Sequence, residues 1–227
     1  MFDLCIGIIV IFYSAVSRRY CYQSKVKGFK QMKNPNRTAR ENRRADTGDS
    51  IDTIVVCAGK HGSSLQYGKW MIEELGCDGM GFDKRKLGYV SMYRNVVYIG
   101  AVRNGDIHML NILWQNYNNF GLEGRNLYIC GVGLGDPDSQ SYVDLLRRRN
   151  GCEGQSNINF FMLPGKIQKN KLIMLDKTLF KNFIEVGAYG LYDKEDADLI
   201  IERAKNDYDG MSRDALQPII KKIIELN

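Results

Sequence analysis

The sequence predicts an α/β domain with a parallel sheet that helices cover on both faces. From Ile51 onward, short apolar or β-branched runs alternate with amphipathic segments of helical periodicity, as in α/β proteins. The strand-like runs are apolar throughout, for example residues 95–102, NVVYIGAV, and do not alternate between apolar and polar residues. Such continuous runs are typical of strands buried on both faces, which form parallel sheets.

Each element follows from its own pattern along the chain. Strands are expected at residues 51–58, 78–82, 95–102, 126–132 and 157–163. Helices are expected at residues 63–75, 107–118, 139–149, 194–207 and 213–226. We expect the first helix to turn Trp70, Met71 and Leu75 inward, and the acidic helix at 194–207 to present a solvated face.

Residues 1–50 differ from the rest of the chain in charge and composition. The 227 residues carry a net charge of +6; residues 1–50 hold 10 Lys and Arg against 4 Asp and Glu, whereas residues 51–227 hold 22 of each. Within the basic part, residues 31–50 lack large apolar side chains almost entirely, which predicts a disordered linker. We therefore divide the chain into an N-terminal segment, 1–50, and one folded domain, 51–227.

An apolar run at residues 4–16 leaves two interpretations open. Its 13 residues are few for a spanning helix, which needs about 20. The positive charges follow the run, beginning at Arg18 and Arg19, and this order favours a downstream domain in the cytoplasm. The run is then either an anchor or surface contact at the inner face of the membrane, or a terminal helix or extension without a role.

The composition argues against several kinds of site. The basic residues lie in the tail without an aromatic-interleaved face, so we expect no nucleic-acid partner. The six cysteines form no C-x-x-C pair, and His61 and His108 are the only histidines, so we expect neither disulfides nor a metal site. Cys57 and Cys130 fall inside apolar strands, which is typical of buried reduced thiols.

A glycine turn between the first strand and the first helix predicts a phosphate site. Gly59 and Gly62 allow the backbone to fold tightly around an anion, and Ser63 and Ser64 offer hydroxyl groups. The first amides of the helix that follows point toward the same place, because they have no partner within the helix. A phosphate monoester is therefore the expected guest. A plain turn between strand and helix remains the alternative.

Four motifs in order give the chain a family resemblance. They are CAGKHGSSLQYGKWMIEELG, VVYIGAVRNGDIHMLNILWQNY, NLYICGVGLGDPDSQSY and FFMLPGKIQKNKLIMLDKTLFKNFI. Together they resemble the flavodoxin-domain family, and most of all its long-chain branch containing the menaquinone-dependent protoporphyrinogen dehydrogenases. The resemblance implies a flavodoxin-like three-layer sandwich with a five-stranded parallel sheet of order 2-1-3-4-5, an inserted helical segment after the last strand, and FMN as cofactor.

The resemblance also implies which residues bind FMN. The first loop would hold the phosphate through Gly59, Lys60, His61, Gly62, Ser63 and Ser64. Lys60 would add a positive charge. The family usually carries a hydroxyl residue in place of Gly59 and a threonine in place of Ser64. Two later loops would enclose the flavin ring through Ala101, Val102, Arg103, Asn104, Gly105, Gly133, Leu134 and Gly135. Asn104 cannot stack on the ring as an aromatic residue would.

Other polar residues have ordinary alternatives to a functional role. Arg103 either faces the flavin edge that becomes anionic on reduction or is a solvated charge. We expect His108 on the surface of the helix at 107–118, and we interpret Asp136 and Asp138 as turn and capping residues. No catalytic residue is assigned, because the cofactor would carry the redox chemistry.

The function classes that remain differ in their partners. Residues 165–187 contain a basic amphipathic pattern that predicts a helix, which either contacts substrate or a membrane surface or packs over the last strand. The favoured class is an FMN-dependent oxidoreductase with a quinone, porphyrin or similar electron partner. A flavodoxin-type electron carrier served by a reductase, and an FMN-free interaction module, are the alternatives. The oligomeric state does not follow from the sequence.

Overall fold

The computed structural model describes residues 52–59, 62–168, 178 and 180–226. The N-terminal segment 1–50, Lys60, His61 and most of the predicted basic helix within 165–187 lie outside these ranges. Within the described ranges, no helix combines the length and the apolar character that crossing a bilayer requires.

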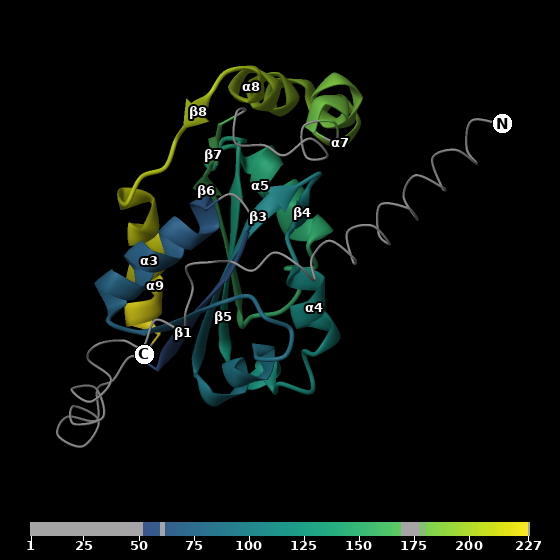
Figure 1. Cartoon of the computed structure of the whole chain (residues 1–227). Coiled ribbons are helices and arrows are strands. Elements are labelled where there is room, and N and C mark those ends of the chain that lie inside the picture. The colour runs from purple at the N-terminus through teal and green to yellow at the C-terminus, as the bar shows by residue number, and fades with distance from the viewer. Residues whose placement is uncertain (1–51, 60–61, 169–177, 179, 227) are drawn as a thin grey trace. The chain divides into compact units, whose positions relative to one another are not determined.

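The central sheet has the predicted topology. Its five main strands are β1 (Thr53–Ala58), β2 (Asp78–Gly81), β3 (Asn95–Arg103), β5 (Asn126–Gly133) and β6 (Ile158–Pro164). They lie in the order β2-β1-β3-β5-β6, and every neighbouring pair is parallel. Counted along the chain, this is the order 2-1-3-4-5, so the flavodoxin-like fold is confirmed (Figure 1).

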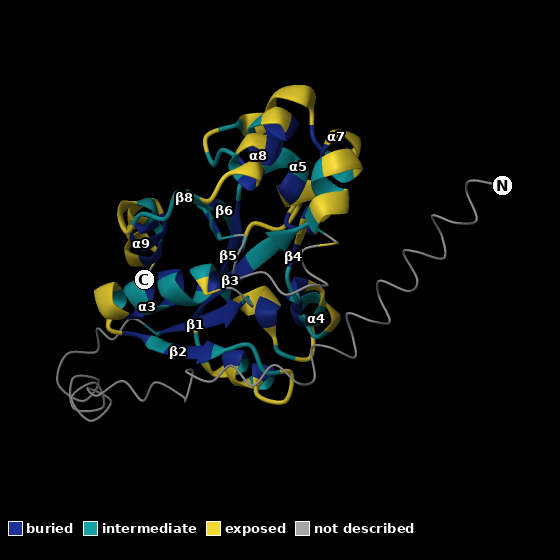
Figure 2. Cartoon of the chain, turned by 45° about the horizontal axis from the view of Figure 1, so that its top comes forward, coloured by how far each residue is buried: buried dark blue, intermediate teal, exposed yellow. Residues whose placement is uncertain are grey.

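Helices cover both faces of this sheet, as the apolar strands require. One face packs against α3 (Ser63–Leu75) and α9 (Gln217–Glu225), and the other against α4 (Leu110–Gln115) and α5 (Gln140–Arg149) (Figure 1). The strands between them are almost wholly buried, whereas the outer sides of the helices are exposed (Figure 2). Continuous apolar strands therefore fill a core on each side of the sheet.

Shorter elements complete the fold. In the described parts of the chain these include the 3₁₀ helices η1 (Leu87–Met92), η2 (Leu122–Gly124) and η5 (Asp214–Leu216). The chain after β6 contains β7 (Lys166–Ile167), the π-helical η4 (Phe183–Gly187), α7 (Ala188–Leu191), α8 (Lys194–Lys205) and β8 (Tyr208–Asp209). We call residues 165–210 the extension. At its start β7 pairs with the distant β8 in an antiparallel ribbon.

The first helix has the predicted bounds but a different buried face. Met71 is buried as expected, whereas Trp70 and Leu75 are only partly buried. The side that faces the sheet is formed by Ser64, Tyr67, Gly68, Met71 and Ile72. Gly68 allows this close packing, because a Cβ there would lie 2.0 Å from the Cys57 sulfur on β1.

The predicted helix at 107–118 is wrong at its start. Ile107 belongs to β4 (Asp106–Ile107), which pairs antiparallel with the end of β3, and the helix begins only at Leu110. Asn104 and Gly105 form the turn between the two strands, with φ values of 49° and 81°. An Asn-Gly pair favours the left-handed conformation at both central positions of a two-residue hairpin, so local turn chemistry overrides the helical pattern.

The acidic helix near the C-terminus is only partly the solvated face that was predicted. It ends at Lys205, and Glu195, Asp198 and Glu202 are exposed. Asp196 is buried instead, where it accepts a hydrogen bond of 2.8 Å from the Ser141 hydroxyl on α5. This contact between two helix N-termini orients α8 against α5, a pairing that helical periodicity alone does not reveal.

Cys57 and Cys130 are buried in their strands, as predicted. Both are free thiols, as are Cys77 and Cys152. Burial raises the pKa of Cys57 to about 12, and it also raises the pKa of Cys130. Both groups are therefore protonated, unreactive packing residues of the core at neutral pH.

Replacement of Gly68 by alanine tests the packing of α3 on the sheet. We expect Gly68→Ala to lower the free energy of unfolding by about 1–3 kcal/mol, because its Cβ would overlap the Cys57 sulfur. The matched control is Gly190→Ala in α7, where a Cβ meets no atom within 4 Å, so its effect is neutral or stabilising. Equal urea-unfolding curves for the two variants would contradict the close packing.

Candidate functional site

The first candidate loop links the end of β1 to the start of α3. Gly62 precedes the helix with a φ of 94°, and its carbonyl accepts the first helical hydrogen bond, from the Gln66 amide at 2.8 Å. No side chain caps this end of α3. The first amides of the helix are therefore available to an anion, and the left-handed conformation explains a glycine at position 62.

Ser64 is an unusual residue within this loop. The residue is only 1% exposed, and its buried hydroxyl makes no hydrogen bond with any residue that the structure describes. A buried hydroxyl without a hydrogen-bond partner lowers the free energy of unfolding by about 1–3 kcal/mol, so most buried hydroxyl groups are hydrogen-bonded. A phosphate oxygen at the N-terminus of α3 would supply an acceptor.

Gly59 is the counterpart of Ser64 across the loop. A Cβ at position 59 would lie 2.9 Å from the Ser64 hydroxyl oxygen, which is too close for an unshifted side chain. A hydroxyl residue at position 59, which the family resemblance implies, would therefore require Ser64 to move. The chain instead combines the smallest residue at 59 with an inward hydroxyl at 64, so the loop keeps one hydroxyl beside the helix N-terminus.

The sheet brings the three candidate loops to one edge. Ala58 pairs with Gly100 and Gly100 pairs with Gly131, so β1, β3 and β5 end side by side. A Cβ at Gly59 would lie 3.8 Å from the Ala101 side chain. A Cβ at Gly133 would lie 3.5 Å from the Cβ of Val102. Residues from all three predicted loops therefore meet at the carboxyl ends of the strands, where ligands bind in open α/β sheets.

The second candidate loop is the tight hairpin of β3 and β4. Asn104 is exposed at its tip, whereas Gly105 is buried. A Cβ at Gly105 would lie 2.8 Å from atoms of both Arg149 and Leu191, so the protein's own side chains occupy the space beside this glycine. Arg103 is partly exposed, and its guanidinium forms no ion pair within the described residues.

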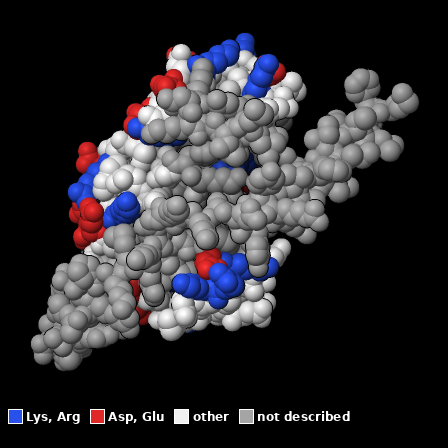
Figure 3. All heavy atoms as spheres, viewed as in Figure 1, with Lys and Arg blue, Asp and Glu red and all other residues white. Residues whose placement is uncertain are grey.

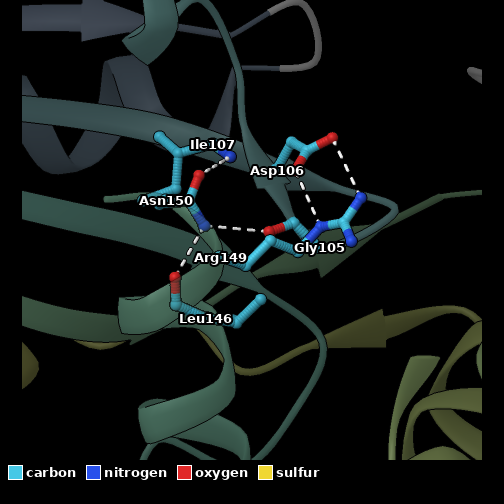
Figure 4. A network of polar contacts seen from close by, with 6 residues as sticks. All are labelled: Gly105, Asp106, Ile107, Leu146, Arg149 and Asn150. Atoms are coloured by element: carbon cyan, nitrogen blue, oxygen red, sulfur yellow. Dashed lines mark hydrogen bonds and ion pairs between the residues drawn. The ribbon is translucent and has the colours of Figure 1, made fainter. Parts of the chain in front are cut away.

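Asn150 fastens this hairpin to the end of α5 (Figure 4). Its side-chain oxygen accepts a hydrogen bond from the Ile107 amide at 2.7 Å, and its side-chain nitrogen donates to the carbonyls of Gly105 and Leu146 at 2.9 and 2.8 Å. Its own carbonyl accepts a bond of 2.7 Å from the Trp114 indole. The buried side-chain amide thus satisfies the turn at Gly105 and the amide of Ile107 in β4 and ties them to α5, while the backbone carbonyl of Asn150 adds the contact with α4.

An ion pair beside this network contributes less to stability than the hydrogen bonds of Asn150. The Arg149 guanidinium donates to the Asp106 carboxylate at 2.8 and 3.4 Å (Figure 4). Both side chains are substantially exposed, so solvent screening limits the contribution to about 0–1 kcal/mol. The buried amide of Asn150, rather than this pair, holds the hairpin in place.

The third candidate loop packs on Tyr142 of α5. A Cβ at Gly133 would lie 2.5 Å from the Tyr142 hydroxyl, and a Cβ at Gly135 would lie 2.3 Å from its ring. Tyr142 is buried, and burial raises the pKa of its phenol, so it is neutral. The two glycines therefore make room for a tyrosine of the same chain, and Leu134 between them is partly buried.

Two further predictions concern polar residues near these loops. His108 does not lie on a helix surface as predicted: it precedes α4, its amide donates to the Ala101 carbonyl at 2.9 Å, and its carbonyl accepts from the Tyr98 hydroxyl. Asp136 is a turn residue, as predicted, because its carboxylate accepts from the Asp138 amide at 3.0 Å. The cap of α5 is Ser139, whose side chain accepts from the Tyr142 amide.

The sequence-based predictions missed three residues that shape the site, namely Tyr142, Asn150 and Arg203. Asn150 precedes Gly151, whose φ of 65° is typical of the residue after a helix end. The sequence near Asn150 does not indicate that its side chain bonds the Gly105 carbonyl, which lies more than 40 positions away.

Across the described ranges, no group of three or more His, Cys, Asp or Glu residues is placed to bind a metal ion.

Comparisons with known proteins give distant structural similarities. No protein-family model matches the chain, and no curated protein matches it. A mutant flavodoxin from Pseudomonas aeruginosa is 12% identical, over 60% of this chain and 96% of that chain, with a TM-score of 0.34. The Trp repressor binding protein from Bacillus subtilis is 6% identical, over 69% and 98%, with a TM-score of 0.38. Rubredoxin:oxygen oxidoreductase from Desulfovibrio gigas is 12% identical, over 68% and 36%, with a TM-score of 0.34.

Two substitutions of Asn150 test its hold on the hairpin. Asn150→Ala should lower the free energy of unfolding by about 2–3 kcal/mol, because buried backbone groups of Gly105 and Ile107 lose their partner. Asn116→Ala is the control, because that side chain bonds one carbonyl of its own helix.

Asn150→Asp should make stability depend on pH. A carboxylate facing two carbonyls has a raised folded-state pKa, whereas the protonated acid donates to one of them. The deficit relative to the wild type should therefore be smaller at about pH 5 than at about pH 8, measured by urea unfolding. A deficit independent of pH would contradict the assigned orientation of the amide.

Proposed function

We propose that this chain is an FMN-binding redox protein of the flavodoxin-domain family and that the first loop holds the phosphate of FMN. The single observation that carries the proposal is the buried, unpartnered hydroxyl of Ser64 at the uncapped N-terminus of α3. A phosphate oxygen would accept from that hydroxyl and from the first amides of the helix. The resemblance of the four sequence motifs supports the same ligand.

The residues of the site have distinct roles in this proposal. Ser64 and the amides of Ser63 and Ser64 bind the phosphate, Gly62 turns the backbone around it, and Gly59 leaves the Ser64 hydroxyl its place. Lys60 and His61, which lie outside the described residues, are proposed to line the same loop. Bound FMN would supply the electron-transfer chemistry, while the protein positions it and limits access of water.

The loop residues of β3 are proposed to lie beside the flavin ring. Ala101 adjoins Gly59, and Val102 adjoins Gly133, so these two residues lie between the first and third loops. Arg103 follows them with its charge unpaired among the described residues and is proposed to attract the anionic parts of the ligand. This role is electrostatic and requires no proton transfer from a side chain.

An oxidoreductase is the form of this function that we favour. Electron carriers usually expose a strongly acidic face that attracts basic partners. Residues 51–227 are balanced in charge, and both signs occur on the face in Figure 3. We therefore propose a quinone, a porphyrin or a similar flat molecule as electron partner, in line with the protoporphyrinogen dehydrogenase branch. A flavodoxin-type carrier that exchanges electrons with a reductase is the alternative.

The partners and location of the protein are part of the same proposal. We place it on the cytoplasmic side of the membrane, with contact to the membrane surface through the N-terminal segment or residues 165–187. The charge order around the apolar run at 4–16 supports this orientation. We propose no nucleic-acid partner.

A second candidate function is an FMN-free interaction module. The observation that favours it is the occupation of the ring-side glycines by side chains of the same protein: Tyr142 fills the space beside Gly133 and Gly135, and Arg149 and Leu191 fill that beside Gly105. The absorption spectrum of the purified full chain, before and after incubation with FMN, separates the two. Flavin bands retained through gel filtration favour the first function, whereas a colourless protein after incubation favours the second.

Ser64→Ala tests the phosphate assignment. We expect the variant to bind FMN about tenfold more weakly, because one hydrogen bond to a charged acceptor is lost. The apoprotein should be as stable as the wild type or more stable, because the variant removes a buried hydroxyl that has no partner. Fluorescence titration with FMN and urea unfolding measure the two effects.

The control for this test is Ser91→Ala, whose hydroxyl bonds the Gly88 carbonyl in η1. It should leave FMN affinity unchanged. If Ser64→Ala binds FMN as tightly as Ser91→Ala does, the phosphate does not contact this hydroxyl.

Arg103→Gln tests the proposed electrostatic attraction. We expect weaker FMN binding at low ionic strength and a smaller salt dependence of Kd, because salt screens the charge that the variant lacks. Arg148→Gln on α5 is the control for a change in net charge, since Arg148 is also exposed and lies in the last turn of its helix. Equal salt dependence in the two variants would show that Arg103 is simply a solvated charge.

A further inference from the structure

The extension approaches the third loop backbone to backbone. The Gly165 amide donates a hydrogen bond of 2.6 Å to the Gly133 carbonyl, and the Gly210 amide donates to the Gly165 carbonyl at 3.1 Å. A Cβ at Gly165 would lie 2.7 Å from the Gly133 oxygen, so a larger residue could not approach in this way. The start and the end of the extension therefore meet at the third loop, where β7 and β8 pair.

Arg203 of α8 makes the second contact between the extension and this loop. One nitrogen of its guanidinium donates to the carbonyls of Leu134 and Gly135, at 2.8 and 3.0 Å. The guanidinium carbon also lies 4.8 Å from the centre of the Tyr208 ring, which holds the group by a cation–π contact. The carbonyls of Gly133, Leu134 and Gly135 thus all accept hydrogen bonds from the extension.

These bonds fix the shape of the third loop. A planar peptide cannot turn its carbonyl without turning the amide of the next residue, so rotation of any of the three peptides breaks a bond to the extension. Tyr142 fills the space beside Gly133 and Gly135, which prevents collapse toward α5. The loop is therefore held between Tyr142 and Arg203 by contacts within the chain.

The charge of Arg203 is not neutralised locally. Within the described ranges no carboxylate forms an ion pair with it, and Asp136, the nearest acid along the third loop, is engaged by the Asp138 amide. The guanidinium is partly buried, so solvent screens it less than an exposed charge. Within the described residues, the two carbonyl dipoles and the Tyr208 ring are the groups that contact this charge, so it acts on the third loop as an unpaired positive charge.

We propose that Arg203 is a positioning residue of the ligand site, which holds the third loop in a preformed shape and biases the site toward a ligand that carries or gains negative charge. This inference rests on the proposed function for its ligand, but not for the loop. If FMN is bound, the positive charge of Arg203 stabilises the reduced flavin that has gained two electrons and one proton, because this form of the ring is an anion. The extension is then part of the site, and α8 belongs to its binding machinery.

Two substitutions separate the geometric role from the electrostatic one. Arg203→Lys keeps the charge but lacks the planar group that stacks on the Tyr208 ring while it bonds the loop, and Arg203→Met removes both the charge and the donors. Lys194→Met is the matched control, because it removes one exposed positive charge from the first turn of the same helix. Hydrogen exchange of the full chain, followed by mass spectrometry, measures the loop without any ligand.

We expect amide exchange in residues 133–136 to become about tenfold faster or more in Arg203→Met and to change less in Arg203→Lys, while β1 and β3 keep wild-type protection. Unchanged exchange of the loop in Arg203→Met would overturn the proposal. Faster exchange throughout the sheet would overturn it too, because Arg203 would then support the whole fold rather than the loop.

Binding of FMN and the two-electron midpoint potential give the second measurement. Both variants should bind FMN more weakly than Lys194→Met does, and only Arg203→Met should shift the potential to a more negative value. Equal affinities and potentials in all three variants would overturn the role at the site. If the wild-type chain binds no FMN, the proposed function fails, while hydrogen exchange still decides whether Arg203 holds the loop.

Discussion

The parallel pairing of β1 with β3 and of β3 with β5 is the constraint on which the rest of the structure depends. Parallel neighbours end at the same edge, so the glycine turn after β1, the hairpin after β3 and the loop after β5 lie together there. The apolar strands make this arrangement stable, because helices bury both faces of the sheet. The position of the candidate site is thus a consequence of strand order.

The glycines at this edge do different things on the two sides of the site. Gly59 and Gly62 leave backbone amides and the Ser64 hydroxyl beside the N-terminus of α3. By contrast, Gly105 and Gly135 accommodate side chains of the same chain, from α5 and α7. The first loop therefore has donors without a partner among the described residues, whereas the second and third loops are packed against side chains of the same protein.

Buried polar groups distinguish these two sides in energetic terms. The amide of Asn150 satisfies its donors and acceptors, and the carbonyls around Leu134 bond the extension, so these parts gain rigidity. The buried hydroxyl of Ser64 has no hydrogen-bond partner among the described residues, which costs free energy.

The sequence by itself determined the five main strands of the sheet, the bounds of α3 and the glycine turn before it, because continuous apolar runs and glycine positions report local conformation directly. Asn104-Gly105 was also readable as a hairpin turn, although the helical pattern after Ile107 obscured it. Only the tertiary structure decided which residues the loops contact. Asn150 lies 45 positions from Gly105 and Arg203 lies 69 from Leu134, and no local pattern encodes which distant carbonyl a side chain will bond.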